Sequence, residues 1–149
     1  MPLALDSAFS EVLGDNVLAI LSYAGVGLVL FVLGFYAVDL ATPGRLVSVI
    51  RHDRNPNASL LAAAGMAAVG VIVSASIYAT DAALTEGLIA TAVYGLVGIV
   101  AQIVAMLIFN LLIGLKIKEL CHEEHLQPGT WMLAVTYLMI GLVTALAVI

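Results

Sequence analysis

The chain has 149 residues, of which 63% are hydrophobic and 10% are charged, and its mean hydropathy is +1.16. Soluble domains carry about 25% charged residues, so this composition excludes an ordinary soluble protein. No phosphate-binding glycine loop, nucleophile motif, zinc signature or nucleic-acid-binding patch occurs in the sequence, and the net charge of −5 gives no reason to expect a nucleic-acid partner.

Four long apolar runs follow one another along the chain. Each has about 20 or more residues, which at about 1.5 Å per residue spans a hydrocarbon core about 30 Å thick. We therefore predict an all-α integral membrane protein with four transmembrane helices in a single domain, residues 1–149. The runs are Val17–Val38, Ala58–Ala79, Gly87–Leu112 and Thr130–Ile149.

The basic side chains are confined to two short segments, 40–57 and 113–129. Lys and Arg are enriched in cytoplasmic loops, so both segments are predicted to be cytoplasmic and both termini to lie outside. The N-terminus lacks the basic flank of a cleavable signal peptide, so the first helix should be retained. The five basic residues are Arg45, Arg51, Arg54, Lys116 and Lys118.

The two halves of the chain share a layout, which suggests an internal repeat. A long apolar run, a polar residue, a basic segment, a turn residue and a small-residue-rich run occur in 17–79 and again in 87–149. Two hairpins that start on the same side form parallel repeats about an axis along the membrane normal. The alignment pairs Asp39 with Asn110, Arg45 with Lys116 and Asn57 with Pro128.

Small residues recur at three- and four-residue spacing in the second and third runs, which favours close helix packing in lipid. We expect these two faces to meet, either inside one bundle or between subunits of a homo-oligomer. The faces consist of Ala63, Ala67, Gly70 and Ser74 in the second run, and of Thr91, Gly95, Gly98, Gln102 and Ala105 in the third.

The first basic segment begins with the turn residues Thr42, Pro43, Gly44 and Arg45. Thr42 can cap a short interfacial helix and Pro43 can occupy its first position. Asn57 and Thr130 are expected to cap the second and fourth transmembrane helices.

Three polar residues are candidates for a functional path. Asp39 follows about 22 apolar residues, so a straight helix delivers it to the inner boundary, where a contact role competes with proton or cation handling. Gln102 lies in the middle of the third run, and Asn110 is the repeat counterpart of Asp39. Each either makes a helix–helix hydrogen bond or lines a polar pathway.

The second basic segment contains the densest group of potential metal ligands. Glu119 and His122 form a Glu-x-x-His pair, and His125 lies three residues further on. A carboxylate-type metal site needs matching ligands from other helices. A solvated charged loop is therefore preferred, and no metal and no cofactor are predicted.

The stretch GFYAVDLATPGRL followed by NPNASLLAAAG resembles the DUF350 (YjfL-like) family of small bacterial inner-membrane proteins. The matching residues are Asp39, Leu40, Thr42, Pro43, Gly44, Asn57 and Ala58. The resemblance implies a duplicated two-helix unit in the bacterial inner (plasma) membrane, and it implies no biochemical activity. The second hairpin departs from the pattern, because Asn110 replaces the expected aspartate and no Thr-Pro-Gly follows.

The absence of a catalytic set favours a non-enzymatic membrane protein that self-associates as a structural or accessory component. Its two basic loops would dock a cytoplasmic protein partner. The alternative is a small channel or transporter for an ion or cationic solute, with Asp39, Gln102 and Asn110 along its path. A metal-dependent membrane enzyme built on Glu119, His122, Glu123 and His125 is the weakest hypothesis.

Overall fold

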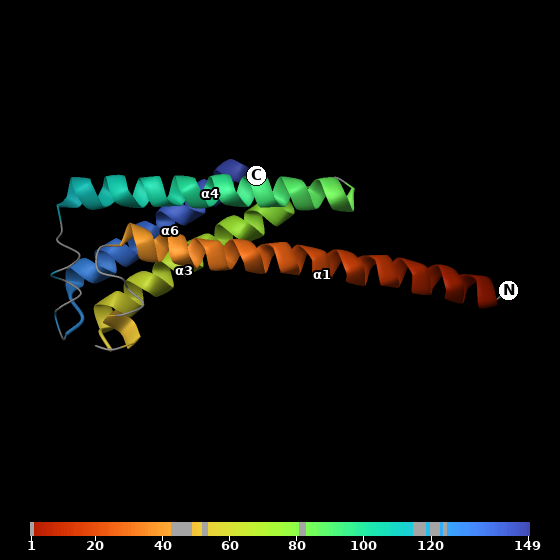
Figure 1. The fold of residues 1–149 in the computed structure, drawn as a ribbon, viewed down its shortest axis with the longest axis horizontal. Coiled ribbons are helices and arrows are strands. Elements are labelled where there is room, and N and C mark those ends of the chain that lie inside the picture. Colours follow the sequence, from red (N-terminus) through yellow and green to blue (C-terminus); the bar gives the residue numbers. More distant parts are fainter. Residues whose placement is uncertain are drawn as a thin grey trace.

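The computed structural model describes residues 2–42, 49–51, 54–80, 83–114, 119, 123 and 125–149. Within these residues the long elements are four helices, and no strand occurs (Figure 1). They are α1 (Pro2–Ala41), α3 (Pro56–Tyr78), α4 (Leu84–Ile113) and α6 (Pro128–Val148).

Each of the four helices is long and apolar enough to cross a membrane. The predicted fold class is thus confirmed at the level of an all-helical chain with four apolar helices. The predicted bounds of the apolar runs differ from the observed ones by a few residues at each end. The observed apolar stretches are Val12–Ala41, Pro56–Tyr78, Leu84–Ile113 and Pro128–Val148.

Local sequence signals explain where three of the helices begin or end. Proline occupies the first position of both α3 and α6, where its missing N–H costs no helical hydrogen bond. Gly114 ends α4 with a φ of 64°, a left-handed conformation that glycine adopts without strain.

The helices α3 and α6 pack against each other most extensively, and α1 and α4 lie beside them (Figure 1). The approach is closest at Gly141 of α6, where an added Cβ would lie 2.7 Å from the Cα of Ala68. Because only the methyl group of Ala68 lies between the two backbones there, α3 and α6 form the tightest helix pair of the bundle.

The helix α1 runs antiparallel to α3, with Gly34 against Val69 and Gly65 against Val38. It has 40 residues and α3 has 23, which correspond to about 60 and about 35 Å. The N-terminal part of α1 therefore extends beyond the rest of the bundle, as Figure 1 shows.

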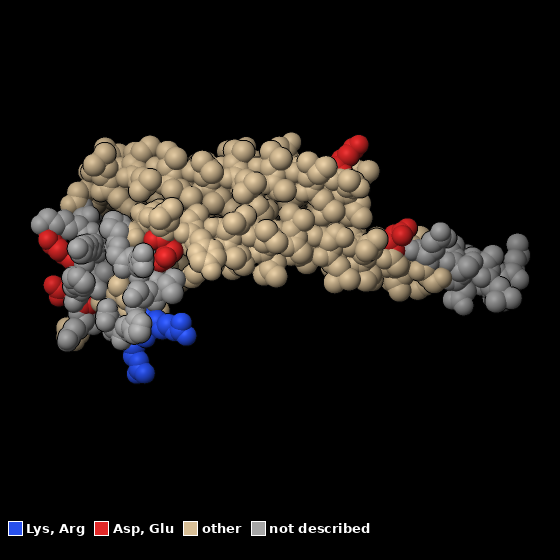
Figure 2. Space-filling view, in the orientation of Figure 1, with Lys and Arg blue, Asp and Glu red and all other residues tan. Residues whose placement is uncertain are grey.

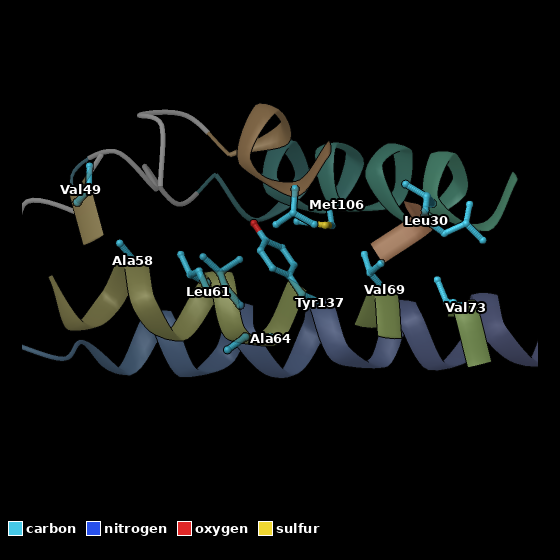
Figure 3. Close-up of a cluster of buried hydrophobic side chains, with 13 residues drawn as sticks. Leu30, Val49, Ala58, Leu61, Ala64, Val69, Val73, Met106 and Tyr137 are labelled. Atoms are coloured by element: carbon cyan, nitrogen blue, oxygen red, sulfur yellow. The ribbon is translucent and has the colours of Figure 1, made fainter. Parts of the chain in front are cut away.

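The buried core lies where all four helices face one another. Tyr137 points from α6 into this core, with Met106 of α4 beside it (Figure 3). Leu30 and Val69 continue the cluster from α1 and α3. These side chains are fully or almost fully buried, so the core is a packed interior.

The two small-residue faces differ in their surroundings. Thr91, Gly95, Gly98 and Gln102 are buried on α4, as the spacing predicts. Their neighbours are not the small residues of α3, because Gly95 faces Leu30 and Gly98 faces Ile72.

On α3, by contrast, Ala63, Ala67 and Ser74 are exposed, and Gly70 is half-buried beside Phe31 of α1. The expectation that the two faces meet inside one bundle is therefore wrong. The buried face of α3 lies on its other side and combines large side chains, such as Leu61 and Ile72, with small ones, such as Ala68, which together fill the space between the helices.

Charged residues lie near the two ends of the bundle (Figure 2). The described basic side chains, Arg51 and Arg54, lie at the end where α1 finishes and α3 begins. Asp15 and Glu86 belong to the N-terminal parts of α1 and α4, toward the opposite end.

Candidate functional site

The side chain of Asn57 joins the start of α3 to the segment before α6. It is fully buried. Its Nδ2 donates to the backbone oxygens of Glu123, at 3.1 Å, and His125, at 3.0 Å. Its Oδ1 accepts from the backbone N–H of Gln127 at 2.9 Å and from the Thr130 hydroxyl at 2.7 Å. The amide thus uses both of its donors and both acceptor positions.

Asn55, which the sequence reasoning missed, is the actual N-cap of α3. Its Oδ1 accepts from the backbone N–H groups of Asn57 and Ala58 at 2.9 and 3.0 Å. Its Nδ2 donates to the backbone oxygen of Glu123 at 2.9 Å. The signal was present, because an asparagine directly before a proline is typical of an N-cap followed by the first helical residue.

The capping roles predicted for Asn57 and Thr130 are therefore corrected. The N-cap position of α6 is Gln127, whose side chain makes no capping bond, while Thr130 donates to Asn57 instead. Asn57 lies inside the first turn of α3. Because Asn55 already accepts from the backbone N–H groups of Asn57 and Ala58, the Asn57 side chain is not needed as a cap and bonds to the segment before α6 instead. We call Asn55, Asn57 and Thr130 the asparagine clasp.

A second polar group links α4 to α6. The Nε2 of Gln102 donates to the backbone oxygen of Tyr137 at 3.0 Å, and the Tyr137 hydroxyl donates to Oδ1 of Asn110 at 2.8 Å. The structure thus connects two of the three candidate pathway residues through Tyr137. A buried tyrosine in an apolar run needs a partner for its hydroxyl, which is the signal that could have identified this residue.

The Oε1 of Gln102 is buried and has no hydrogen-bond partner within the described part of the chain. Leaving a buried carbonyl oxygen unpaired costs about 1–3 kcal/mol. Gln102 therefore makes one helix-to-helix bond with its amide nitrogen while its oxygen adds no stability.

The third candidate, Asp39, lines a pocket of about 270 Å³ between α1, α3 and residues 49–51. It is half-buried, and the exposed Arg51 lines the same pocket. Val38 packs against Gly65, so Asp39 is level with the part of α3 about two turns after its first residue.

The predicted turn is described only in part. Thr42 is buried, and its hydroxyl donates to the backbone oxygen of Val38 at 3.0 Å. It therefore satisfies a carbonyl at the end of α1. Pro43, Gly44 and Arg45 lie outside the described residues.

The metal-ligand candidates are also described in part. Glu119 and His125 are exposed, and His122 lies outside the described residues. Within the described residues no group of three His, Cys, Asp or Glu side chains could hold a metal ion. This segment contributes two backbone carbonyl oxygens to the asparagine clasp, those of Glu123 and His125.

Comparison with known proteins identifies the family. The model of DUF350, a domain of unknown function, matches residues 12–148. The chain belongs to the DUF350 family. The resemblance seen in the first hairpin therefore extends over almost the whole chain.

The DUF350 relatives include proteins from mycobacteria. A UPF0719 transmembrane protein of Mycolicibacterium paratuberculosis is 41% identical over 130 residues, which cover 87% of this chain and 86% of the relative. UPF0719 transmembrane proteins of Mycobacterium bovis and Mycobacterium tuberculosis are each 38% identical over 132 residues, 89% of this chain and 87% of the relative. No solved structure matches the chain. This DUF350 chain is thus a multi-pass membrane protein.

Proposed function

We propose that the chain is a non-enzymatic accessory component of the bacterial inner membrane that self-associates through the exposed face of α3. The observation that carries this proposal is that Ala63, Ala67 and Ser74 of α3 are exposed, whereas the opposite side of the same helix is buried against the rest of the bundle. Small side chains allow two helix backbones to approach closely in lipid. Two copies pairing α3 with α3 would form a symmetric dimer.

The exposed face of α3 also suits a helix partner because the Ser74 hydroxyl on it already makes a hydrogen bond within the helix. The Ser74 hydroxyl donates to the backbone oxygen of Gly70 at 2.8 Å. A second helix could therefore pack on the face without burying an unpaired hydroxyl.

The polar side chains of the interior support an accessory role over a channel. The Nε2 of Gln102 and the Oδ1 of Asn110 are engaged in bonds between α4 and α6. A conducting path would have to break these bonds or run past them.

The proposal includes the arrangement in the membrane. The two hairpins, 17–79 and 87–149, would be tandem repeats with both termini outside. Segments 40–57 and 113–129 would lie in the cytoplasm, where they dock a protein partner. Support comes from Arg51 and Arg54, which precede Asn55 of the asparagine clasp in the chain and belong to segment 40–57.

The test is the oligomeric state of the full chain in lipid nanodiscs or mild detergent, measured by native mass spectrometry. The wild type should be dimeric or larger, and Ala67→Leu should weaken association by about tenfold or more, because the added bulk separates the helices. Ala101→Leu, on an exposed position of α4, adds the same bulk elsewhere and should leave association unchanged. A wild type that is monomeric at all concentrations would refute the proposal.

A further inference from the structure

The N-terminal part of α1 extends well past the helices that pack against the rest of it. Gly95 of α4 faces Leu30, and α4 begins at Leu84, about three turns before Gly95. Because α1 and α4 run in the same direction (Figure 1), the start of α4 is level with about Ala19 of α1. Residues 2–18 of α1, about 25 Å of helix, therefore have no described helix beside them.

The expected membrane boundary falls at the same level of α1. The length of the first apolar run predicts that Asp39 lies at one boundary, and about 20 residues before it, at about Ala19, a helix has crossed a hydrocarbon core about 30 Å thick. The apolar stretch Val12–Ala41 is about 45 Å long and exceeds this span by about ten residues. Tilting of α1 alone cannot absorb the excess, because α1 packs along both α3 and α4.

Apolar side chains on the projecting part would stand in water if α1 stayed straight in a bilayer. Phe9, Val12 and Leu13 are 66, 60 and 53% exposed. With Leu5 and Ala8 they recur at three- and four-residue spacing in the sequence, which is the pattern of a helix with one apolar side. The residues between them are polar: Asp6, Ser7, Ser10 and Glu11. A helix of this kind lies in the membrane interface with its apolar side in the lipid.

Gly14 and Asp15 separate this amphipathic segment from the transmembrane run. Glycine weakens a helix interior, and an added Cβ on Gly14 would meet nothing within 4 Å, so no packing contact fixes the direction of α1 here. Aspartate favours the N-cap over the helix interior, because its carboxylate accepts from the first free N–H groups. The two residue types are suited to ending one helix and beginning the next.

We propose that α1, which is continuous from Pro2 to Ala41, bends at Gly14 in a bilayer, so that residues 2–13 lie along the membrane surface with Phe9 in the interface. The partner of this segment is thus the lipid surface. Its polar side carries acids and no Lys or Arg, so apolar contact holds it, without attraction to anionic headgroups. The proposal rests neither on self-association through α3 nor on the side of the membrane at which the N-terminus lies.

The test is tryptophan fluorescence of the full chain in phosphatidylcholine nanodiscs, whose two faces are both accessible. Trp131 is the single tryptophan, so Phe9→Trp and Ser10→Trp are each combined with Trp131→Phe. Lipids brominated near the carbonyl end of the acyl chains quench tryptophan in the interface, and iodide quenches tryptophan in water. The bromolipids should quench Phe9→Trp about threefold more than Ser10→Trp, and iodide should show the reverse order.

Further substitutions, each combined with Phe9→Trp, locate the bend and its driving force. Replacing both Gly14 and Asp15 by alanine favours a straight helix and should lower bromolipid quenching about twofold. Gly25→Ala is the control, because this glycine of α1 also has no neighbour within 4 Å of an added Cβ, and it should leave the quenching unchanged. Leu13→Ser removes part of the apolar side and should raise iodide quenching about twofold.

Circular dichroism and thermal melting check that every variant is folded. Equal iodide quenching of Phe9→Trp and Ser10→Trp would overturn the proposal, because a straight α1 exposes both positions to water. Protection of Phe9→Trp from iodide without quenching by bromolipid would also overturn it, and would identify a second copy or another protein as the partner of this face. Unchanged bromolipid quenching after replacement of Gly14 and Asp15 would overturn the position of the bend.

Discussion

At the scale of single residues, hydrogen-bonding amides hold the bundle together at two positions. Asn57 satisfies four groups that belong to the other half of the chain. Gln102 makes one bond and leaves Oε1 unpaired among the described residues. The sequence presents both simply as polar residues, and only their partners distinguish a saturated clasp from a partly satisfied contact.

We expect Asn57→Ala to lower the free energy of unfolding by about 3 kcal/mol, because several buried donors and acceptors lose their partner at once. The measurement is unfolding by SDS titration in mixed micelles. Asn16→Ala, on an exposed part of α1, is the matched control and should change stability by about 0.5 kcal/mol or less. Equal effects of the two substitutions would contradict the role of Asn57.

At the scale of helices, glycine decides how closely the elements approach. An added Cβ on Gly141 would press on the backbone of Ala68, which cannot move aside without shifting α3. At Gly95 the nearest atoms belong to the Leu30 side chain, which can change its rotamer. The α3–α6 pair is therefore the contact least tolerant of added volume.

We expect Gly141→Ala to destabilise the protein by about 2 kcal/mol, because overpacking separates α3 from α6. Gly25→Ala should be neutral or stabilising by about 0.5–1 kcal/mol, because its Cβ would have no neighbour within 4 Å. Thermal melting in detergent, combined with SDS titration, compares the two. A Gly141→Ala protein as stable as Gly25→Ala would show that the helices can separate at little cost.

At the scale of the whole molecule, one end of the bundle carries the clasp, the pocket and the described arginines. The hydrogen bonds of the asparagine clasp join the start of α3 to the segment before α6. Arg51 lines the same pocket as Asp39.

The orientation can be tested with a thiol reagent that does not cross membranes. Cys121, the single cysteine, should be labelled in spheroplasts only after permeabilisation. In a Cys121→Ser background, Ser10→Cys should be labelled without permeabilisation, because the positive-inside rule predicts that the N-terminus lies outside. The reverse pattern would invert the proposed topology.

The sequence by itself determined that the chain forms four apolar helices, because helix length and hydropathy are local properties. It also determined the family, through the Asp-Leu-x-Thr-Pro-Gly step and the asparagine at position 57. The buried small-residue face of α4 could be predicted for the same reason, since its spacing is set within one helix.

Only the tertiary structure decided which faces meet and which partners the polar residues take. The Ala63–Ala67 side of α3 is as apolar as its buried side, so hydropathy cannot tell which one faces the bundle. The partners of Asn57 lie 66 to 73 residues away, and Asp39 and Arg51 line one pocket from different segments. Contacts across such separations depend on how the helices pack, and no local pattern encodes them.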